Sequence, residues 1–381
     1  MANSPKTIGI DASRANRARK TGVEWYSFRL IQELKGTIPS DCRVVLYSDE
    51  PLRGELGELP ENWNGQVLKW PPRRLWTLLR LSWEMYRNPP DLLFVPSHVL
   101  PLVLPKSSVI TVHDVGFTAF PEAYGRKDRL FQGLMTARAA KTASDILTVS
   151  EFSKAEIARH FPEASGRVTV TPLAFDPYRF PVQERGEVLS AVGRNRLRPP
   201  YFLFVGRLES KKNIDGLIRA FRIFHEQHAG QVGARQLALV GPPGRGYEAA
   251  KAGLSGSLAT DFIREVGYAD DVDLPLLYAG AEALVFPSRY EGFGLPVLEA
   301  FASRIPVILS RTASLPEVAG EAAEYFDPDS PEDLARAMRL IAESRERRDF
   351  LVQAGEDRLR GFSWKKTARM TWEVLSSRLN P

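Results

Sequence analysis

The chain has 381 residues, which is more than one ordinary hydrophobic core holds and enough for two α/β domains. Its hydrophobic fraction of 44% and charged fraction of 25% are typical of soluble globular proteins, and no stretch approaches the ~20 apolar residues of a membrane span. The single cysteine, Cys42, excludes an internal disulfide and favours a reducing, cytoplasmic location. Five scattered histidines show no metal-ligand spacing, so we expect no metal site. The first residues lead directly into a strand, so we also expect no signal peptide.

The net charge of +5 belongs to the N-terminal half. Residues 1–185 hold 25 Lys and Arg against 20 Asp and Glu, whereas the remainder holds 26 of each. This half would suit an anionic partner such as a membrane surface or a phosphate-bearing acceptor. Nucleic acid is also anionic, but no nucleic-acid-binding motif is present, so we expect no nucleic-acid partner.

Apolar runs of strand length alternate with helical patterns along the chain, which is typical of parallel α/β sheets. A basic loop, residues 14–20, follows the first run, and Gly22 leads into a helical pattern over residues 23–34. We assign residues 1–185 to one Rossmann-like domain. Its predicted strands are residues 7–11, 43–47, 91–95, 108–112, 146–149 and 168–170.

Residues 75–87 form a helical pattern rich in Trp and Leu, directly after Arg73 and Arg74. Basic residues beside aromatic ones are typical of helices that lie on a membrane surface. The alternative is a helix packed into the domain core, since apolar residues cover much of its circumference. The sequence leaves both interpretations open.

A charged segment that ends in Arg198-Pro199-Pro200 predicts an interdomain linker at residues 186–200. We predict a second Rossmann-like domain over residues 201–365. The last segment, residues 366–381, is expected to contain a helix that packs back on the N-terminal domain. The predicted strands of the second domain are residues 201–205, 236–240, 283–287 and 305–309.

Two motifs of the first domain are weak signals by themselves. Gly22 ends the loop after the first strand, where backbone N–H groups could meet an acceptor or a phosphate. His113 and Asp114 follow a strand, at the edge where open α/β sheets bind ligands. A histidine near its ordinary pKa could donate a hydrogen bond to a sugar hydroxyl, with Asp114 orienting it, but a structural histidine is the commoner case.

The second domain carries a basic turn at the end of its first strand. Gly206 closes this strand, and Arg207 and Lys212 flank the turn before the next helical pattern. An arginine offers a planar fork and a lysine a movable point charge, so the two could hold a diphosphate. The alternative is a solvated turn, which becomes less favoured once the acidic loop of the same domain is considered.

That acidic loop follows the strand-like run 283–287 and reads Glu291-Gly292-Phe293-Gly294-Leu295-Pro296-Val297-Leu298-Glu299. Pro296 suits the first turn of a helix, so two carboxylates bracket a helix N-terminus whose N–H groups attract phosphate. The glycines permit positive φ and close approach of a ligand. Carboxylates hydrogen-bond sugar hydroxyls well. The layout therefore predicts a nucleotide sugar as the ligand.

Together these motifs resemble glycosyltransferase family 4, whose members are retaining enzymes with the GT-B fold. The resemblance implies two Rossmann-like domains whose parallel sheets face an interdomain cleft. The acidic loop is the most specific match, and His113-Asp114 and Ser150-Glu151-Phe152-Ser153 are similar to the mannosyltransferase-like branch. The matching segments span roughly residues 7–375 and also include Gly206-Arg207, Lys212-Asn213, Val266-Gly267-Tyr268 and Ser314 to Gly320.

The resemblance implies catalytic roles for four residues. Arg207 and Lys212 would bind the donor diphosphate and stabilise the leaving group, and Glu291 would contact the transferred sugar. His113 would lie by the reacting face of that sugar. Glu299 would bind the ribose hydroxyls, and the other donor-binding residues would be Gly22, Gly206, Gly267, Tyr268, Gly292, Phe293, Gly294 and Leu295.

The chain departs from the family pattern at Arg304, where relatives usually have glycine. We infer from the arginine that this position does not need a positive φ. The loop before Gly22 also lacks the second glycine often present in the family, which weakens its expected acceptor role.

The resemblance implies a metal-independent hexosyl transfer that retains the anomeric configuration and needs no cofactor besides the donor. GDP-mannose is the first choice of donor and a UDP-sugar the alternative. Asp271 and Asp273 form an Asp-x-Asp, but we interpret their segment as the start of a helix. The acceptor would be a glycan or a lipid-linked glycan in polysaccharide biosynthesis, with peripheral contact at the inner membrane face.

Two other functions remain open at this point. A GT-B nucleotide-sugar epimerase would use the same fold and convert the donor without an acceptor. A non-catalytic module would bind the sugar nucleotide without turnover, which the presence of both cations and both glutamates disfavours.

Overall fold

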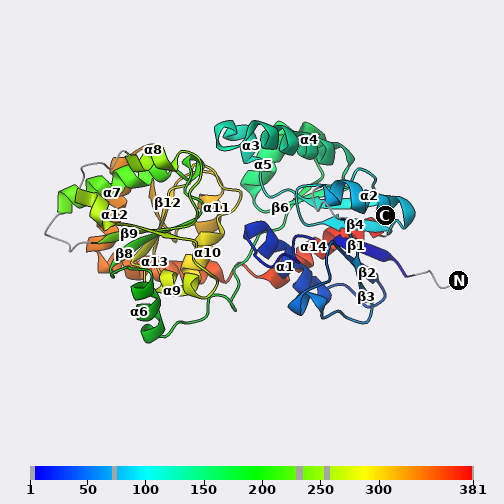
Figure 1. Cartoon of the computed structure of the whole chain (residues 1–381), viewed down its shortest axis with the longest axis horizontal. Coiled ribbons are helices and arrows are strands. Elements are labelled where there is room, and N and C mark those ends of the chain that lie inside the picture. Colours follow the sequence, from blue (N-terminus) through cyan, green and yellow to red (C-terminus); the bar gives the residue numbers. More distant parts are fainter. Residues whose placement is uncertain (1–4, 71–74, 229–234, 253–257, 380–381) are drawn as a thin grey trace. The chain divides into compact units, whose positions relative to one another are not determined.

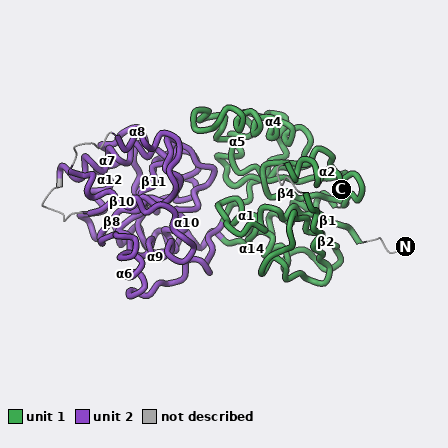
Figure 2. Tube along the Cα trace, viewed as in Figure 1, with its two compact units in different colours: residues 1–173, 363–381 green, residues 174–362 purple. Residues whose placement is uncertain are grey.

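The computed structural model describes residues 5–70, 75–228, 235–252 and 258–379 (Figure 1). The chain divides into two compact units (Figure 2). Unit 1 comprises residues 1–173 and 363–381, and unit 2 comprises residues 174–362.

Unit 1 is built on a parallel sheet of seven strands among its described residues, in the order β3-β2-β1-β4-β5-β6-β7. The chain moves outward from β1 to β3 and then returns to β4 on the other side of β1. The topological switch point therefore lies between β1 and β4. The strands are β1 (Thr7–Asp11), β2 (Arg43–Ser48), β3 (Trp63–Val67), β4 (Leu92–Val95), β5 (Ser107–Thr111), β6 (Asp145–Thr148) and β7 (Val168–Val170). The helices are α1 (Gly22–Lys35), α2 (Trp76–Arg87), α3 (Gly116–Ala119), α4 (Arg126–Thr142), α5 (Glu151–His160) and α14 (Trp364–Leu379).

Unit 2 repeats this plan with six parallel strands among its described residues, in the order β10-β9-β8-β11-β12-β13. Its switch point lies between β8 and β11 by the same argument. The strands are β8 (Tyr201–Val205), β9 (Gln236–Val240), β10 (Ile263–Gly267), β11 (Ala283–Phe286), β12 (Val307–Ser310) and β13 (Glu324–Phe326). The helices are α6 (Arg185–Arg194), α7 (Ile214–His228), α8 (Tyr247–Ala252), α9 (Asp273–Ala279), α10 (Leu295–Ala302), α11 (Leu315–Ala319), α12 (Pro331–Glu343) and α13 (Arg345–Leu359).

The central strands are mostly apolar because helices cover both faces of a parallel sheet. All residues of β4, β9 and β11 are buried. In unit 2, side chains of α7 and α12 join those of β8 and β9 in one hydrophobic cluster, which includes Phe202, Leu239, Phe221 and Met338. The continuous apolar runs that predicted these strands are a direct result of this two-sided burial.

Three strands were missed by the sequence analysis, and each lies at the edge of a sheet. β3 reads Trp-Asn-Gly-Gln-Val and buries only its first residue. β10 has no fully buried residue, and β13 is only three residues long. An edge strand is covered less than a central one, so it lacks the apolar run by which a buried strand is recognised.

The division between the units falls elsewhere than the predicted linker. Residues 186–200 belong to unit 2, where α6 packs on α9 and Arg194 bonds Asp273 with 2.7 Å between nitrogen and oxygen. The chain passes from unit 1 to unit 2 after Leu173 and returns after Phe362. Helix α14 packs on α1 within unit 1, and its Thr367 hydroxyl donates to the Pro172 carbonyl at 2.6 Å.

Helix α2 packs one face into unit 1 and leaves the other exposed, which confirms the packed helix and leaves the membrane contact a prediction. One face, which includes Trp76, Leu81 and Met85, is buried in unit 1. The opposite face exposes large apolar side chains, among them Trp83 and Tyr86. Arg73 and Arg74, which precede the helix, lie outside the described residues.

The inference about Arg304 was wrong, because this residue has a φ of +57°. It follows Ser303 at the end of α10, where helices commonly place a residue in the left-handed conformation. Glycine suits that position best since it has no Cβ. An ion pair of 2.6 Å between Arg304 and Glu356 on α13 accompanies the strained backbone.

We expect Arg304→Gly to raise the free energy of unfolding by up to about 1 kcal/mol, because relief of the left-handed strain exceeds the loss of an exposed ion pair. Arg304→Ala, the matched control, loses the ion pair and keeps the strain, so it should be destabilising. Urea denaturation of both variants measures the difference. A glycine variant less stable than the alanine variant would contradict the strain argument.

Candidate active site

The predicted cationic and acidic loops meet at the switch point of unit 2. Strands β8 and β11 are neighbours and run parallel, so their carboxyl ends lie at one edge of the sheet. Gly206 and Arg207 follow β8, and the segment from Glu291 to Gly294 follows β11. Segments about 80 residues apart therefore converge at the edge where open α/β sheets bind ligands.

Lys212 and Glu291 are in direct contact at this edge. The Lys212 Nζ donates a hydrogen bond to Glu291 Oε1, and both side chains are largely buried. The ammonium group also lies 5.3 Å from the centre of the Phe286 ring. Arg207 is exposed, and no described residue forms a hydrogen bond or an ion pair with its guanidinium. The edge thus offers a paired cation and carboxylate beside a second cation.

Glycines allow the strand ends to pack closely beside this pair. A Cβ on Gly241, which follows β9, would lie 2.0 Å from the Gly206 carbonyl oxygen. The Gly241 amide donates to the Gly267 carbonyl at 2.6 Å, and Gly267 has a φ of +74° at the end of β10. Its neighbour Tyr268 is exposed. The predicted base-pocket residues therefore lie at the same edge of the sheet as Gly206.

The acidic loop ends at Gly294, which has a φ of +102° and precedes α10. A Cβ on Gly294 would lie 2.8 Å from Leu315 Cδ2, so the position requires glycine. Pro296 occupies the first turn, and Gly294 supplies no side-chain cap to the helix. An uncapped N-terminus retains N–H groups that can donate to a phosphate.

Ser314 holds the acidic loop in place, although the sequence analysis gave it no role. Its buried hydroxyl lies 2.9 Å from the Glu291 carbonyl and 3.0 Å from the Phe293 carbonyl. Gly292 and Phe293 therefore belong to a segment with a fixed backbone path, and the Phe293 side chain is buried. No spacing rule in the sequence could have paired Ser314 with this loop.

Glu299 lies one turn into α10 in a buried, polar setting. Its Oε2 accepts a hydrogen bond of 2.9 Å from the Tyr278 hydroxyl, and its Oε1 lies 3.9 Å from Arg179. Burial raises the pKa of the Glu299 carboxyl, and the positive charge of Arg179 opposes this shift. Arg179 also bonds Asp271 at 2.8 Å. Tyr278 and Arg179 are site residues that the sequence did not reveal.

His113 follows β5 in unit 1, at the carboxyl edge of that sheet. Its ring contacts Tyr26 edge-on, with 4.6 Å between ring centres, and lies 5.1 Å from the His98 ring. Burial, and then the charge of His98, lowers the pKa of His113 to about 3. The ring is therefore neutral at physiological pH, contrary to the near-ordinary pKa expected from the sequence. Its buried Nε2 has no hydrogen-bond partner among the described residues.

Gly22 is the first residue of α1 rather than part of the preceding loop. The Thr21 amide donates to Glu24 Oε2 at 3.2 Å, so a capping interaction organises this N-terminus. A Cβ on Gly22 would contact nothing within 4 Å. The glycine is therefore not required by packing inside unit 1.

Neither a metal cluster nor a membrane span is found among the described residues. Over the ranges given above, no three His, Cys, Asp or Glu side chains are arranged to hold a metal ion. No helix of the same ranges is long and apolar enough to cross a membrane.

Comparison with known proteins agrees with this geometry. The pattern of a family described as Glycosyltransferase Family 4 matches residues 20–179, and that of Glycosyl transferases group 1 matches residues 187–358. The O-antigen chain mannosyltransferase B of Escherichia coli is 32% identical over 303 residues, which cover 79% of this chain and 76% of that protein. The chain belongs to glycosyltransferase family 4. It is a hexosyltransferase that takes a sugar from a nucleotide-sugar donor, and the epimerase and non-catalytic alternatives are not favoured.

Further family members share parts of the chain. The O-antigen chain mannosyltransferase RfbU of Salmonella typhimurium is 26% identical over 276 residues, which cover 72% of this chain and 70% of that protein. The MMP alpha-(1->4)-mannosyltransferase of Mycolicibacterium hassiacum is 30% identical over 245 residues, covering 63% of this chain and 56% of that enzyme.

Solved structures confirm the predicted GT-B fold of this family member. Sucrose-phosphate synthase from Thermosynechococcus elongatus superposes with a TM-score of 0.75 at 20% identity, covering 98% of both chains. Anabaena Alr3699/HepE, solved in complex with UDP and glucose, superposes with a TM-score of 0.70 at 17% identity, covering 98% of this chain and 99% of that one.

The low pKa of His113 predicts a specific acid sensitivity. An unfolded histidine has a pKa near 6.5, so between pH 6.5 and 3 a proton binds the unfolded chain and not the folded one. The stability that the buried neutral ring contributes is complete above about pH 6.5 and declines as the pH falls. We expect His113→Asn to reduce the pH slope of the unfolding free energy in this range, by at most ~1.4 kcal/mol per pH unit.

Urea denaturation at a series of pH values measures this slope. The matched control is His160→Asn, which removes a histidine from α5 of the same unit. A slope that is unchanged in the His113 variant would show that the ring is protonated in the folded enzyme.

Proposed function

We propose that this enzyme transfers a mannosyl residue from GDP-mannose to a glycan or lipid-linked glycan, with retention and without a metal ion or cofactor. The observation that carries the proposal is the contact between Lys212 and Glu291 at the switch point of unit 2. The mannose assignment is supported by the names of the mannosyltransferases that are similar to this chain. The alternative donor is a UDP-sugar, which the HepE complexes contain.

In the proposed mechanism, the donor diphosphate separates Lys212 from Glu291. The ammonium then binds the phosphate oxygens with Arg207, and Glu291 accepts hydrogen bonds from the hydroxyls of the transferred sugar. As the bond from the sugar to the phosphate breaks, negative charge grows on the diphosphate, and the two fixed cations stabilise it. This charge stabilisation would remove the need for a metal ion.

The remaining residues bind the donor in this proposal. Glu299, held by Tyr278, accepts hydrogen bonds from the ribose, and the N-terminus of α10 with Gly292 to Leu295 binds sugar and phosphate. Gly206, Gly267 and Tyr268 line the nucleotide at the same edge. His113 is a neutral ring whose single N–H bonds the Pro96 backbone, so its unpartnered Nε2 would accept a hydrogen bond from a sugar hydroxyl.

In this scheme the anomeric configuration is retained because the acceptor attacks the sugar on the same face from which the leaving group departs. The acceptor hydroxyl attacks C1 while its proton passes to the departing phosphate oxygen, and neither glutamate forms a covalent bond.

We expect nuclear magnetic resonance of the product to show the same α configuration as the donor. Loss of activity on addition of EDTA, or a β-linked product, would contradict the metal-free retaining mechanism.

A screen of nucleotide sugars tests the donor. We expect GDP-mannose to raise the melting temperature more than UDP-glucose does, since a ligand at 100 times its Kd stabilises by about 2.7 kcal/mol. A shift with the UDP-sugar alone would overturn the donor assignment and leave glycosyl transfer intact.

Lys212→Ala tests the role of the cation in the same protein. We expect kcat to fall by at least about 100-fold, the scale of losing one charge-stabilising group, at a temperature where circular dichroism shows the variant to be folded. Lys211→Ala is the matched control and should keep most of the activity. Unchanged turnover in the Lys212 variant would exclude its leaving-group role.

We also propose peripheral contact with the cytoplasmic face of a membrane, through an apolar surface on unit 1. This surface consists of the outer face of α2 and the first half of α4, joined by the segment 102–103. The Leu102 amide donates to the Ser82 hydroxyl at 2.7 Å, and the Leu102 carbonyl accepts from Arg138 at 2.8 Å, so these elements are neighbours. Its exposed apolar residues are Leu79, Trp83, Tyr86, Leu102, Val103, Leu130, Phe131 and Leu134.

Basic side chains border the apolar surface. Arg126, Lys127 and Arg129 are exposed in the first turn of α4, and Arg87 lies 5.8 Å from the Trp83 ring. Apolar residues flanked by cations are typical of protein surfaces that enter the headgroup region of anionic lipids. A lipid-linked acceptor would then reach the enzyme within the plane of the membrane.

We expect Leu130→Gln with Leu134→Gln to weaken binding to phosphatidylglycerol vesicles by at least about tenfold, because two exposed leucines lose their apolar contact with lipid. Co-sedimentation measures the binding. The matched control is Leu258→Gln, an exposed leucine of unit 2. Wild-type protein that does not sediment with anionic vesicles would exclude the membrane contact.

A further inference from the structure

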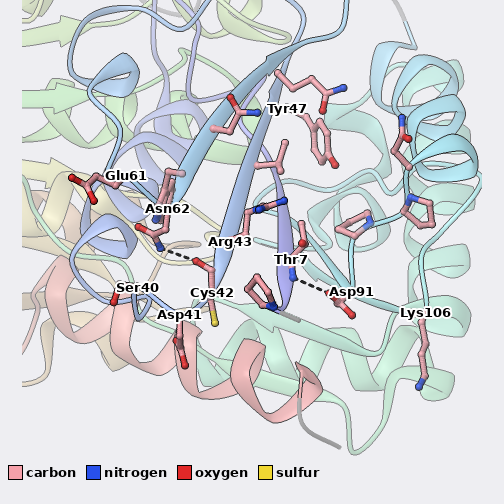
Figure 3. A pocket seen from close by; sticks show the side chains of 18 residues that line it. Thr7, Ser40, Asp41, Cys42, Arg43, Tyr47, Glu61, Asn62, Asp91 and Lys106 are labelled. Atoms are coloured by element: carbon pink, nitrogen blue, oxygen red, sulfur yellow. Dashed lines mark hydrogen bonds between the residues drawn. The ribbon is translucent and has the colours of Figure 1, made fainter. Parts of the chain in front are cut away.

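Unit 1 contains a hollow that opens at the amino edge of its sheet, opposite the carboxyl edge that carries His113 (Figure 3). Its volume is about 900 Å³, within the range of sites for small ligands. Thr7, Arg43, Asp91 and Lys106 line it at or just before the amino ends of β1, β2, β4 and β5, and Tyr47 and Gln66 extend the lining along the sheet toward the carboxyl ends of β2 and β3. His113 follows the carboxyl end of β5, so the two edges are separated by the length of the strands, about 17 Å for five residues.

Residues of β2 and β3 form one wall of the hollow. Alternate residues of a strand point to the same face, and the register pairs Val45 with Asn64 and Tyr47 with Gln66. Gln66 is covered by α2, since its amide donates to Glu84 at 2.9 Å. Asn64 is exposed. The polar residues of β3, which kept this strand from being predicted, thus line a pocket.

Tyr47 is a buried residue in the lining of this pocket. A Cβ on Gly9 would lie 2.6 Å from Tyr47 Cε2 and 3.0 Å from Pro90 Cγ, so the ring lies directly against the β1 backbone. The side chain is only 3% exposed, and burial followed by the charge of Glu84 raises its pKa to about 12. The hydroxyl therefore stays protonated, and no described residue hydrogen-bonds it. Figure 3 shows Tyr47 and Arg43 on the same side of β2, with the hydroxyl directed into the hollow.

The other polar groups are fixed in orientation by the protein. The Asn62 amide donates to the Cys42 carbonyl at 2.7 Å, and the amides of Gln66 and Asn88 donate to Glu84 at 2.9 and 2.8 Å. These hydrogen bonds hold the three amides in place, and each amide has a carbonyl oxygen that can accept a further hydrogen bond. A tyrosine hydroxyl that no described residue bonds, together with amides held in place by the protein, gives the pocket the polar groups of a binding site.

The charged residues that line the pocket indicate whether its ligand is charged or neutral. Arg43 and Lys106 are balanced by the carboxylates of Asp41, Glu61 and Asp91, so the pocket has no excess of positive charge for an anion. Fixed acceptors together with donors suit a neutral molecule with many hydroxyls, since each hydroxyl both donates and accepts. Val45 and the ring of Pro90 add apolar area for the C–H face of a sugar ring.

We propose that this pocket is a second saccharide-binding site, which holds a part of the glycan acceptor remote from its reacting end. The choice of a saccharide rests on the proposed transfer to a glycan. Tyr47 binds one sugar hydroxyl, and Arg43, Gln66, Asn88 and Asn64 bind others. Only a glycan long enough to extend between the two edges of unit 1 occupies both this pocket and the catalytic edge, so the pocket favours long acceptors.

Calorimetric titration with a linear α-mannose oligosaccharide tests the proposal. We expect Tyr47→Phe to bind this probe about 2- to 12-fold more weakly, the factor that corresponds to one hydrogen bond. Its melting temperature should not fall, since no hydrogen bond inside the protein is lost. Tyr86→Phe, on the outer face of α2, is the matched control and should bind as the wild type does.

Asn64→Ala provides a second variant, because the exposed amide can be removed without disturbing the core. In transfer assays, both pocket variants should raise the KM of a long acceptor and leave that of a short acceptor unchanged. Wild-type protein that fails to bind the oligosaccharide, equal binding by Tyr47→Phe, or preferred binding of inorganic phosphate would each overturn the proposal. Weakened binding in a protein without transferase activity would support the pocket and refute the proposed function instead.

Discussion

The parallel direction of the strands is the constraint on which the site of this enzyme depends. In a parallel sheet all carboxyl ends meet at one edge, and the reversal of strand order between β8 and β11 leaves two loops there with no crossover between them. Lys212 from one loop and Glu291 from the other are consequently in contact, although 78 residues separate them in the chain. Glycines at the strand ends complete the edge, because Gly241 passes so close to the Gly206 carbonyl that no Cβ fits.

The site contains two opposite charges, Lys212 and Glu291, that are in contact with each other. A largely buried ammonium without a partner would be unfavourable, so the contact with Glu291 stabilises Lys212. Glu299 is held differently, by the Tyr278 hydroxyl in a buried setting. In unit 1, His113 is neutral because its ring is enclosed next to His98. Burial therefore raises the pKa of Glu299 and lowers the pKa of His113, two effects that the sequence did not reveal.

Strands and motifs differed in how well the sequence predicted them. Central strands such as β9 and β11 were predicted because burial on both faces favours a continuous run of apolar residues, as in Leu237–Val240 and Ala283–Phe286. The edge strand β3 was missed because one of its faces is polar, and that face lines the pocket below Tyr47. Arg304 was misjudged because a side chain can tolerate a left-handed backbone when the end of a helix demands it.

The sequence by itself determined the family, the two-unit α/β plan and the donor-site motifs, because local spacing around glycines and prolines fixes the strand-to-helix turns. Contacts between distant segments were decided only by the tertiary structure. Ser314 beneath the acidic loop, Arg179 and Tyr278 around Glu299, and His98 beside His113 carry no local signal. They become neighbours only when the sheets assemble, since a sequence pattern records which residues are buried but not which of them touch.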